Sequence, residues 1–351
     1  MLERKNSRNS RNLTLISFAF LLFAISMIYF TNPFEVSDVI PENANPDISA
    51  NQYREPDLPP RKATNGDPNN KIYIAIIDSE YKPSDIQCQL KDAWIKDIDQ
   101  YNFIDGVEFY SNVSFQNEKC DIQSISFPQP PSRFNMKHNP SCMIMKNMLK
   151  IFLERSDAGW LLYVTDSAFV NLKNLQKLIH SLYCNDPINQ PRISGHCIEV
   201  RDYFQIFVKN SGALISRKTA LLLSQTEKIW NISCEIEIDG SEAVAHSLDV
   251  NKMYAIRNHN QRFLGHPFTQ EKFYDILLNK KFSELEKCPL KYESKRVCSP
   301  TTQPINELAV WSSVGDYMNK SFFIQNAKRM LEVDSSVYFK YNGYQSELCV
   351  F

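Results

Sequence analysis

The stretch GWLLYVTDSAFVNLKNL, residues 159–175, decides the fold of this chain. Its run from Trp160 to Val164 is apolar and β-favouring, which predicts a buried strand. The run ends at an acid, Asp166, that stands between two hydroxyl residues. Beyond Asn171, a good helix cap, leucines recur at helical spacing, so an amphipathic helix follows the turn. Ligands of α/β sheets bind outside the carboxyl ends of strands, which is where this order places Asp166.

An earlier segment predicts the first strand of the same sheet. Ile72 to Ile77 is a continuous β-favouring run that ends at Asp78 and Ser79, as a fully buried strand would. Segments 106–111 and 122–127 read as short strands, and apolar residues over 143–153 predict a helix that leads into the central strand. Asp78 and Ser79 either meet a ligand at the strand end or cap a turn.

Two later segments complete the predicted domain. Residues 203–221 predict a strand, a small-residue turn, a short strand and a helix capped by Ser216. The turn contains Gly212 and Ala213, and the missing side-chain volume would let a ligand or another backbone come close. An acidic cluster over 234–242 then leads into a further helix.

Composition limits the class of protein. The chain has 351 residues, a net charge of −1 and 12% aromatic residues, which suits one sizeable core or two small ones. Balanced charge argues against nucleic-acid binding, which normally needs a basic excess. The short-strand sandwich pattern of adhesion proteins and receptors is also missing.

The N-terminal region predicts a membrane anchor. A basic tail over residues 1–12 precedes an uncharged apolar run over 13–30, and eighteen helical residues span about 27 Å, close to the hydrocarbon thickness. A cleaved signal peptide is the alternative, but its apolar region would be shorter and end in small residues. The basic flank belongs in the cytoplasm, which sends the rest into the lumen. Residues 31–70, with seven prolines and no apolar periodicity, predict a disordered stem.

The cysteines agree with a lumenal domain. All nine lie beyond the apolar run, as expected where disulfides form. The odd number leaves at least one thiol that is free or joined to another chain, in a homo- or hetero-oligomer. Three glycosylation triplets begin at Asn112, Asn231 and Asn319. We therefore expect a single-pass type II glycoprotein of the Golgi or endoplasmic reticulum membrane.

The order of the motifs resembles the fringe and core 1 β1,3-galactosyltransferase branch of the inverting β1,3-glycosyltransferases, glycosyltransferase family 31. Residues 160–175 resemble its strand, acidic triplet and helix start, and 209–221 its glycine-alanine turn and following helix. Residues 242–245 resemble its Glu-Asp-Val-Ala segment, and 262–268 its RFHPF segment. The resemblance covers 71–270 and implies the GT-A fold, an α/β Rossmann-like mixed sheet flanked by helices, with 271–351 as a C-terminal extension.

The resemblance also implies a reaction and a site. A hexose, galactose or N-acetylglucosamine, would pass with inversion from a UDP-sugar to a hydroxyl of a glycan or glycoprotein. The leaving diphosphate needs a cation, usually manganese held by carboxylates, and the acceptor needs a base. The expected residues are Glu242 as base; Asp166 and His266 at the metal; and Asp78, Ser79, Asp166, Ser167, Gly212 and Ala213 around the donor and acceptor.

Two departures from the family support a second hypothesis. The triplet Asp-Asp-Asp is here Thr165-Asp166-Ser167, and neutral hydroxyls are poor ligands for a hard dication. The family's base aligns with Ala243, which cannot accept a proton. The alternative is therefore a catalytically silent relative that acts as a chaperone, binding protein or partner subunit. The alternative interpretations of the three residues are a turn former for Asp166, a structural residue for His266 and a helix-start charge for Glu242.

Overall fold

The residues that the structure describes all fall within one of the chain's two compact units, Leu58–Phe351. The computed structural model describes residues 66–78, 83–127, 140–182, 185–200, 204–207, 211–226, 230–231, 233–234, 239–250, 256–260, 262–264, 278, 290–293, 301–312, 320–333, 337–342 and 345–350. None of the helices in these ranges is both long and apolar enough to cross a membrane. The predicted anchor, 13–30, lies outside the described residues.

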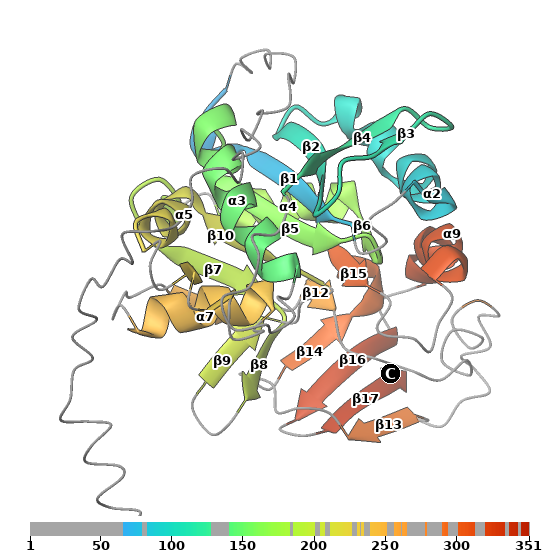
Figure 1. The fold of residues 1–351 in the computed structure, drawn as a ribbon. Helices are drawn as coiled ribbons and strands as arrows, with labels where there is room; N and C mark the ends of the chain where they lie inside the picture. The colour runs from blue at the N-terminus through green and yellow to red at the C-terminus, as the bar shows by residue number, and fades with distance from the viewer. Residues whose placement is uncertain are drawn as a thin grey trace, which may run out of the picture. The chain divides into compact units, whose positions relative to one another are not determined.

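A mixed eight-stranded sheet forms the centre of the unit, as the sequence predicted (Figure 1). Across the sheet the strands are β11 (Ile256–His259), β7 (Arg192–Gly195), β10 (Ala213–Ser216), β5 (Trp160–Thr165), β1 (Ile72–Ile77), β2 (Ile104–Ser111), β4 (Ile122–Ser126) and β3 (Gln116–Asn117). Strand β1 pairs in parallel with both β2 and β5, whereas β10 is antiparallel to β5 and β7. The predicted strands at 72–77, 106–111, 122–127 and 160–164 are all confirmed.

The strand order reverses at β1. From β1 the chain continues outward through β2 to β4 on one side, and then returns to place β5 on the other side. The carboxyl ends of β1 and β5 lie side by side, because Ile77 pairs with Thr165 in parallel register. Such a switch point leaves a crevice beyond the strand ends, where α/β sheets bind their ligands.

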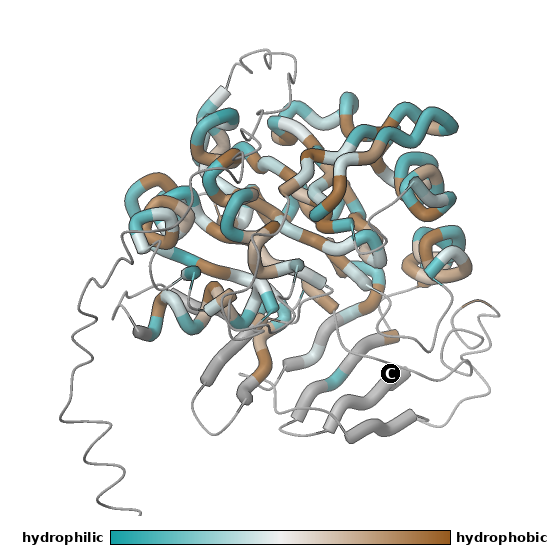
Figure 2. Tube along the Cα trace, viewed as in Figure 1, coloured by the Kyte–Doolittle hydropathy of each residue, from teal (hydrophilic) through white to brown (hydrophobic). Residues whose placement is uncertain are grey.

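Helices cover both faces of the sheet and bury it. One face packs against α2 (Asp85–Ala93), α4 (Leu172–Ser181) and α9 (Lys320–Leu331), and the other against α3 (Pro140–Arg155), α5 (Arg217–Ser224) and α7 (Gly240–Val250). Leu162 and Val164 of β5 belong to the apolar core on the face that α2, α4 and α9 cover, while Leu161 and Tyr163 belong to the core on the face of α3, α5 and α7. Figure 2 shows the resulting apolar centre with hydrophilic residues on the outer helices. Each buried Leu or Val contributes about 1.5–3 kcal/mol.

Smaller sheets extend the unit beyond the central one. Strand β6 (Ala168–Val170) pairs with β15 (Val310–Ser312), which pairs with β12 (Phe263–Leu264). Four C-terminal strands, β13 (Leu290–Glu293), β17 (Gln345–Val350), β16 (Val337–Asn342) and β14 (Thr301–Pro304), form a second sheet, and β8 (Cys197–Val200) pairs with β9 (Phe204–Phe207). Short 3-10 helices are η1 (Pro68–Asn70), η2 (Ile95–Gln100) and η6 (Ile305–Glu307).

The last residues of the predicted stem contact the folded domain. The carbonyl of Pro68 accepts a hydrogen bond of 2.8 Å from the amide of Gly159, the residue before β5. Towards the C-terminus, α9 lies in the part of the chain that the resemblance left as a C-terminal extension.

Disulfides join helices to neighbouring segments. Cys88 of α2 is bonded to Cys120, 32 residues later, and Cys142 of α3 is bonded to Cys234, 92 residues later. Cys197 is disulfide-bonded as well. Bonds of this kind persist in oxidising compartments.

Candidate functional site

The turn after β5 is held tightly against β1. The amide of Asp166 donates to the carbonyl of Ile77 over 3.1 Å, which continues the parallel ladder by one residue. The hydroxyls of Thr165 and Ser167 are 2.7 Å apart and bond to each other. All three residues of the turn are buried. The sequence therefore placed the turn correctly at the carboxyl end of a central strand, and the structure adds that this end lies at the switch point.

Asp166 forms an ion pair with the first residue of α9. The Lys320 Nζ lies 3.3 Å from Asp166 Oδ2 and 3.4 Å from Oδ1, so the ammonium faces both carboxylate oxygens. The Asp166 side chain is 2% exposed and that of Lys320 is 29% exposed, so the lysine reaches the acid from the solvent side. Sequence reasoning missed Lys320, because no local pattern connects residues that lie 154 positions apart.

Asp78 faces α2 and is enclosed. It is fully buried, and its carboxylate accepts a hydrogen bond from the Gln87 side chain. The Gln87 oxygen in turn accepts from the amide of Ser84 over 3.0 Å and from the Asn117 side chain over 2.8 Å. This network fixes the start of α2 over the end of β1. Ser79, the neighbouring predicted residue, lies outside the described residues.

Among the residues that the structure describes, the donor set around Asp166 does not fit a divalent metal ion. Manganese and magnesium prefer several carboxylate oxygens, but the described partner of the Asp166 carboxylate is the Lys320 ammonium, and the flanking hydroxyls bond to each other. Over the ranges that the structure describes, no group of three His, Cys, Asp or Glu side chains could hold a metal. His266, the other predicted metal ligand, lies outside those ranges.

Gly212 brings two backbones together. Its φ of +64° is in the left-handed region, and a Cβ built there would lie 1.6 Å from the carbonyl oxygen of Tyr163. Its neighbour Ala213 pairs with Tyr163 in the antiparallel ladder and is fully buried. Of the two readings of this turn, close approach of another backbone is therefore the one observed. The glycine lets β10 sit beside β5 near its carboxyl end.

The acidic segment begins α7 on the opposite face from α9. Asp239 Oδ1 accepts from the amides of Ser241 and Glu242 over 2.9 and 3.0 Å, which closes the first turn. Glu242 is half-buried, whereas Ala243 is fully buried in the core between α7 and α3. Burial, and then the charge of Asp239, raise the pKa of the Tyr163 hydroxyl well above its usual value.

The late motif joins the strand that follows Asp166. The carbonyl of Arg262 accepts from the amides of Ala309 and Val310 over 2.8 and 3.0 Å, which starts β12 beside β15. Because β15 also pairs with β6, the segments 262–264 and 168–170 share one small sheet. Two motifs that stand about a hundred residues apart in sequence are thus brought together.

Comparisons with known proteins give weak similarities. No family model and no curated protein matches the chain. Among solved structures, it is similar to a glycosyltransferase involved in the glycosylation of the major capsid of PBCV-1 (14% identity, TM-score 0.36, 54% of this chain and 81% of that one). It is also similar to an active-site mutant of LgtC, with 14% identity and a TM-score of 0.41 over 75% of this chain and 97% of that one. A third similar structure is the glycosyltransferase GlyE of Streptococcus pneumoniae TIGR4, with 10% identity and a TM-score of 0.32 over 78% of this chain and 64% of that one. These scores assign neither a family nor an activity to the chain.

Proposed function

We propose that this chain is a GT-A glycosyltransferase that takes galactose or N-acetylglucosamine from a UDP-sugar and transfers it, with inversion, to a hydroxyl of a glycan or glycoprotein. The observation that carries the proposal is the switch point between β1 and β5, where Asp166 and Lys320 meet at the carboxyl end of the sheet. Binding at this edge is the rule for open α/β sheets. The choice of sugar transfer as the reaction rests on the order of the sequence motifs over 160–268.

Lys320 would do part of the work that a metal does in related enzymes. An ammonium has three N–H donors, so it can contact Asp166 and also donate to a phosphate oxygen of the donor. The Lys320 side chain is 29% exposed, so a ligand can reach it from the solvent side. Asp166 would then position the ammonium rather than coordinate an ion. We infer a metal-independent donor site on these grounds.

Two further residues complete the proposal. The acceptor hydroxyl needs a base within hydrogen-bond reach, and Glu242, half-buried in the first turn of α7, is the candidate. His266 follows β12, which belongs to the same small sheet as the strand after Asp166, and is proposed to contact the diphosphate. The apolar run 13–30 and the disulfides support a type II protein of the Golgi or endoplasmic reticulum lumen.

One observation favours a second function. Asp166, the sole carboxylate of its triplet, is already neutralised by an ammonium, and the position of the family's base is a buried alanine. Losing one acid-base group commonly costs a hundredfold or more in rate. The alternative is a silent relative that folds and binds a partner chain or glycan without transferring sugar.

The test measures donor binding and turnover separately. UDP is titrated into the full chain by calorimetry, with manganese and with EDTA, and release of labelled galactose or N-acetylglucosamine from the UDP-sugars is followed under the same conditions. The enzyme proposal expects binding and turnover that survive EDTA. Binding without turnover would support the silent relative, and absence of UDP binding would overturn the proposal of a nucleotide site.

Variants assign the roles. Lys320→Met and Asp166→Asn are expected to weaken UDP binding at least tenfold, and His266→Ala to weaken it less. Glu242→Gln is expected to lower turnover at least a hundredfold while UDP binding is unchanged. If Glu242→Gln turns over sugar as fast as the native chain does, the base is another residue.

A further inference from the structure

A groove runs between α2 and α9 on the face of the sheet that α4 also covers. Two hollows of about 440 Å³ and about 360 Å³ make it up, and they share Ala93, Asp97 and Lys328. We call it the α2–α9 groove. The larger hollow falls within the range of roughly 300–1,000 Å³ that is usual for small-molecule sites.

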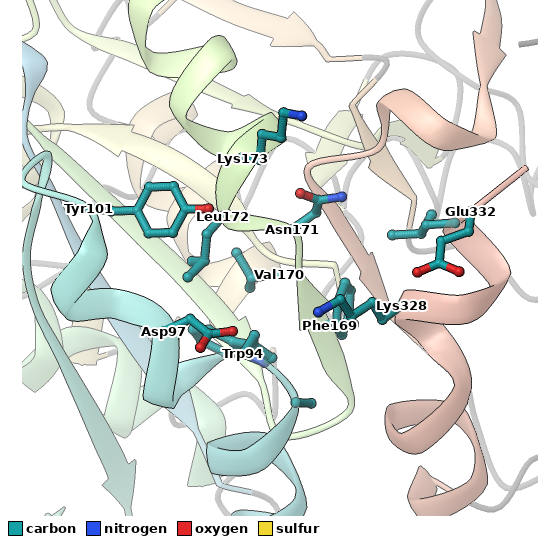
Figure 3. Close-up of a pocket in the computed structure, with 12 residues that line it drawn as sticks. Trp94, Asp97, Tyr101, Phe169, Val170, Asn171, Leu172, Lys173, Lys328 and Glu332 are labelled. Carbon is teal, nitrogen blue, oxygen red and sulfur yellow. The ribbon is translucent and has the colours of Figure 1, made fainter. Parts of the chain in front are cut away.

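The larger hollow has an apolar base and a polar rim (Figure 3). Trp94, Phe169 and Leu331 are buried residues that line it, and Tyr101 contributes a half-buried ring. In Figure 3, Trp94, Asp97 and Tyr101 lie on one side of the hollow, Lys328 of α9 and Glu332 just after its end on the other, and Asn171 and Lys173 at the start of α4 between them. Apolar ring surface beneath hydrogen-bonding groups suits a ligand that is itself amphipathic.

The charges on the rim are balanced and open to a ligand. Across the two hollows, three acids (Asp92, Asp97 and Glu332) face three lysines (Lys96, Lys173 and Lys328), so the groove has no net charge. Among the residues that the structure describes, Lys173, Lys328 and Glu332 form no ion pair. Gln89 and Gln325 of the smaller hollow add amide donors and acceptors. A nucleotide or an acidic ligand would be met by a basic excess instead.

From these features we infer that the α2–α9 groove binds a short neutral oligosaccharide. Sugar hydroxyls can donate to the carboxylates of Asp97 and Glu332 and accept from Lys173 and Lys328, and the sugar C–H faces can rest on Tyr101 and the apolar base. Lys328 lies two turns after Lys320, about 12 Å along α9, and Phe169 of the larger hollow lies three residues after Asp166, so the groove extends away from the Asp166–Lys320 pair along α9. The inference goes beyond sugar transfer and does not depend on it.

The test uses binding of free sugars in the absence of nucleotide. The full chain is titrated with chitotriose, maltotriose and lacto-N-tetraose, and with sialyllactose as an anionic comparison, by ligand-observed NMR and calorimetry. Lys328→Trp fills the position that both hollows share. Arg329→Trp is the matched control, because Arg329 is an exposed neighbour on α9 that does not line the groove.

We expect binding of at least one neutral sugar, weakened tenfold or more by Lys328→Trp and unchanged by Arg329→Trp. Asp97→Ala is expected to weaken it as well. The inference is overturned if no neutral sugar binds, if sialyllactose binds more tightly than all of them, or if Lys328→Trp has no effect. UDP affinity, measured on the same variants, is expected to stay constant, so failure of this site and failure of the donor site are told apart.

Discussion

Removing the ammonium from Asp166 is the most informative perturbation of the fold. In Lys320→Met the aliphatic stem is kept, but a carboxylate that is 2% exposed loses the charge 3.3 Å away. Breaking a buried pair from one side commonly costs 3–5 kcal/mol, because the remaining charge stays desolvated. The partial exposure of Lys320 places the expectation at the lower end, about 3 kcal/mol of unfolding free energy.

Urea unfolding followed by circular dichroism measures this loss, and a double-mutant cycle assigns it to the pair. Asp166→Asn alone should lower the free energy of unfolding by less than Lys320→Met does. The double variant Asp166→Asn/Lys320→Met should have an unfolding free energy within about 1 kcal/mol of that of the native chain. Lys328→Met, an exposed lysine on the same helix, is the control and should change stability by about 0.5 kcal/mol or less. Additive single effects, or a loss in Lys320→Met no larger than the control, would refute the claim that the pair is coupled.

Three other perturbations test the remaining structure. Gly212→Ala should lower the free energy of unfolding by more than about 4 kcal/mol or abolish folding, because the added Cβ would meet the Tyr163 carbonyl. Near-native stability of this variant on thermal unfolding would show that β10 does not approach β5 as described. Because the fold raises the pKa of the Tyr163 hydroxyl, the unfolded chain loses this proton at a lower pH than the native chain does. The free energy of unfolding should therefore fall above pH 10, and Tyr163 should contribute about 1.4 kcal/mol per pH unit to that fall. In Tyr163→Phe, the free energy of unfolding should fall less steeply between pH 9 and 11 than in the native chain. An unchanged slope would contradict the raised pKa of Tyr163. Replacing Cys88 and Cys120 by serine opens a loop of 32 residues and should lower unfolding free energy by about 3–4 kcal/mol, checked by urea titration against the native chain under non-reducing conditions.

The central architecture could be predicted from the sequence because its signals are local. Continuous apolar runs marked β1 and β5, and the caps Asn171 and Ser216 marked α4 and α5. Each cap side chain accepts from the amide three residues later, as capping requires. The small-residue turn at Gly212 was recognised for the same reason, since only a local volume argument was needed.

The parts that escaped prediction depend on distant pairings. Nothing near residue 320 indicates that Lys320 would meet Asp166, and the strands of the C-terminal sheet pair across gaps with no strong alternation. The buried role of Ala243 could not be read from its aligned position, because a helix shows which face is buried only once its packing partner, here α3, is known. The α2–α9 groove likewise joins residues from separate parts of the chain.

Photoaffinity labelling tests the nucleotide site most directly. A 5-azido-uridine diphosphate is cross-linked to the full chain, with and without an excess of UDP, and the modified peptides are sequenced. We predict labelling that UDP suppresses and that falls on the ends of β1 and β5 or on the start of α9. Labelling confined to the α2–α9 groove or to other surfaces, or labelling that UDP does not suppress, would contradict a donor site at the switch point.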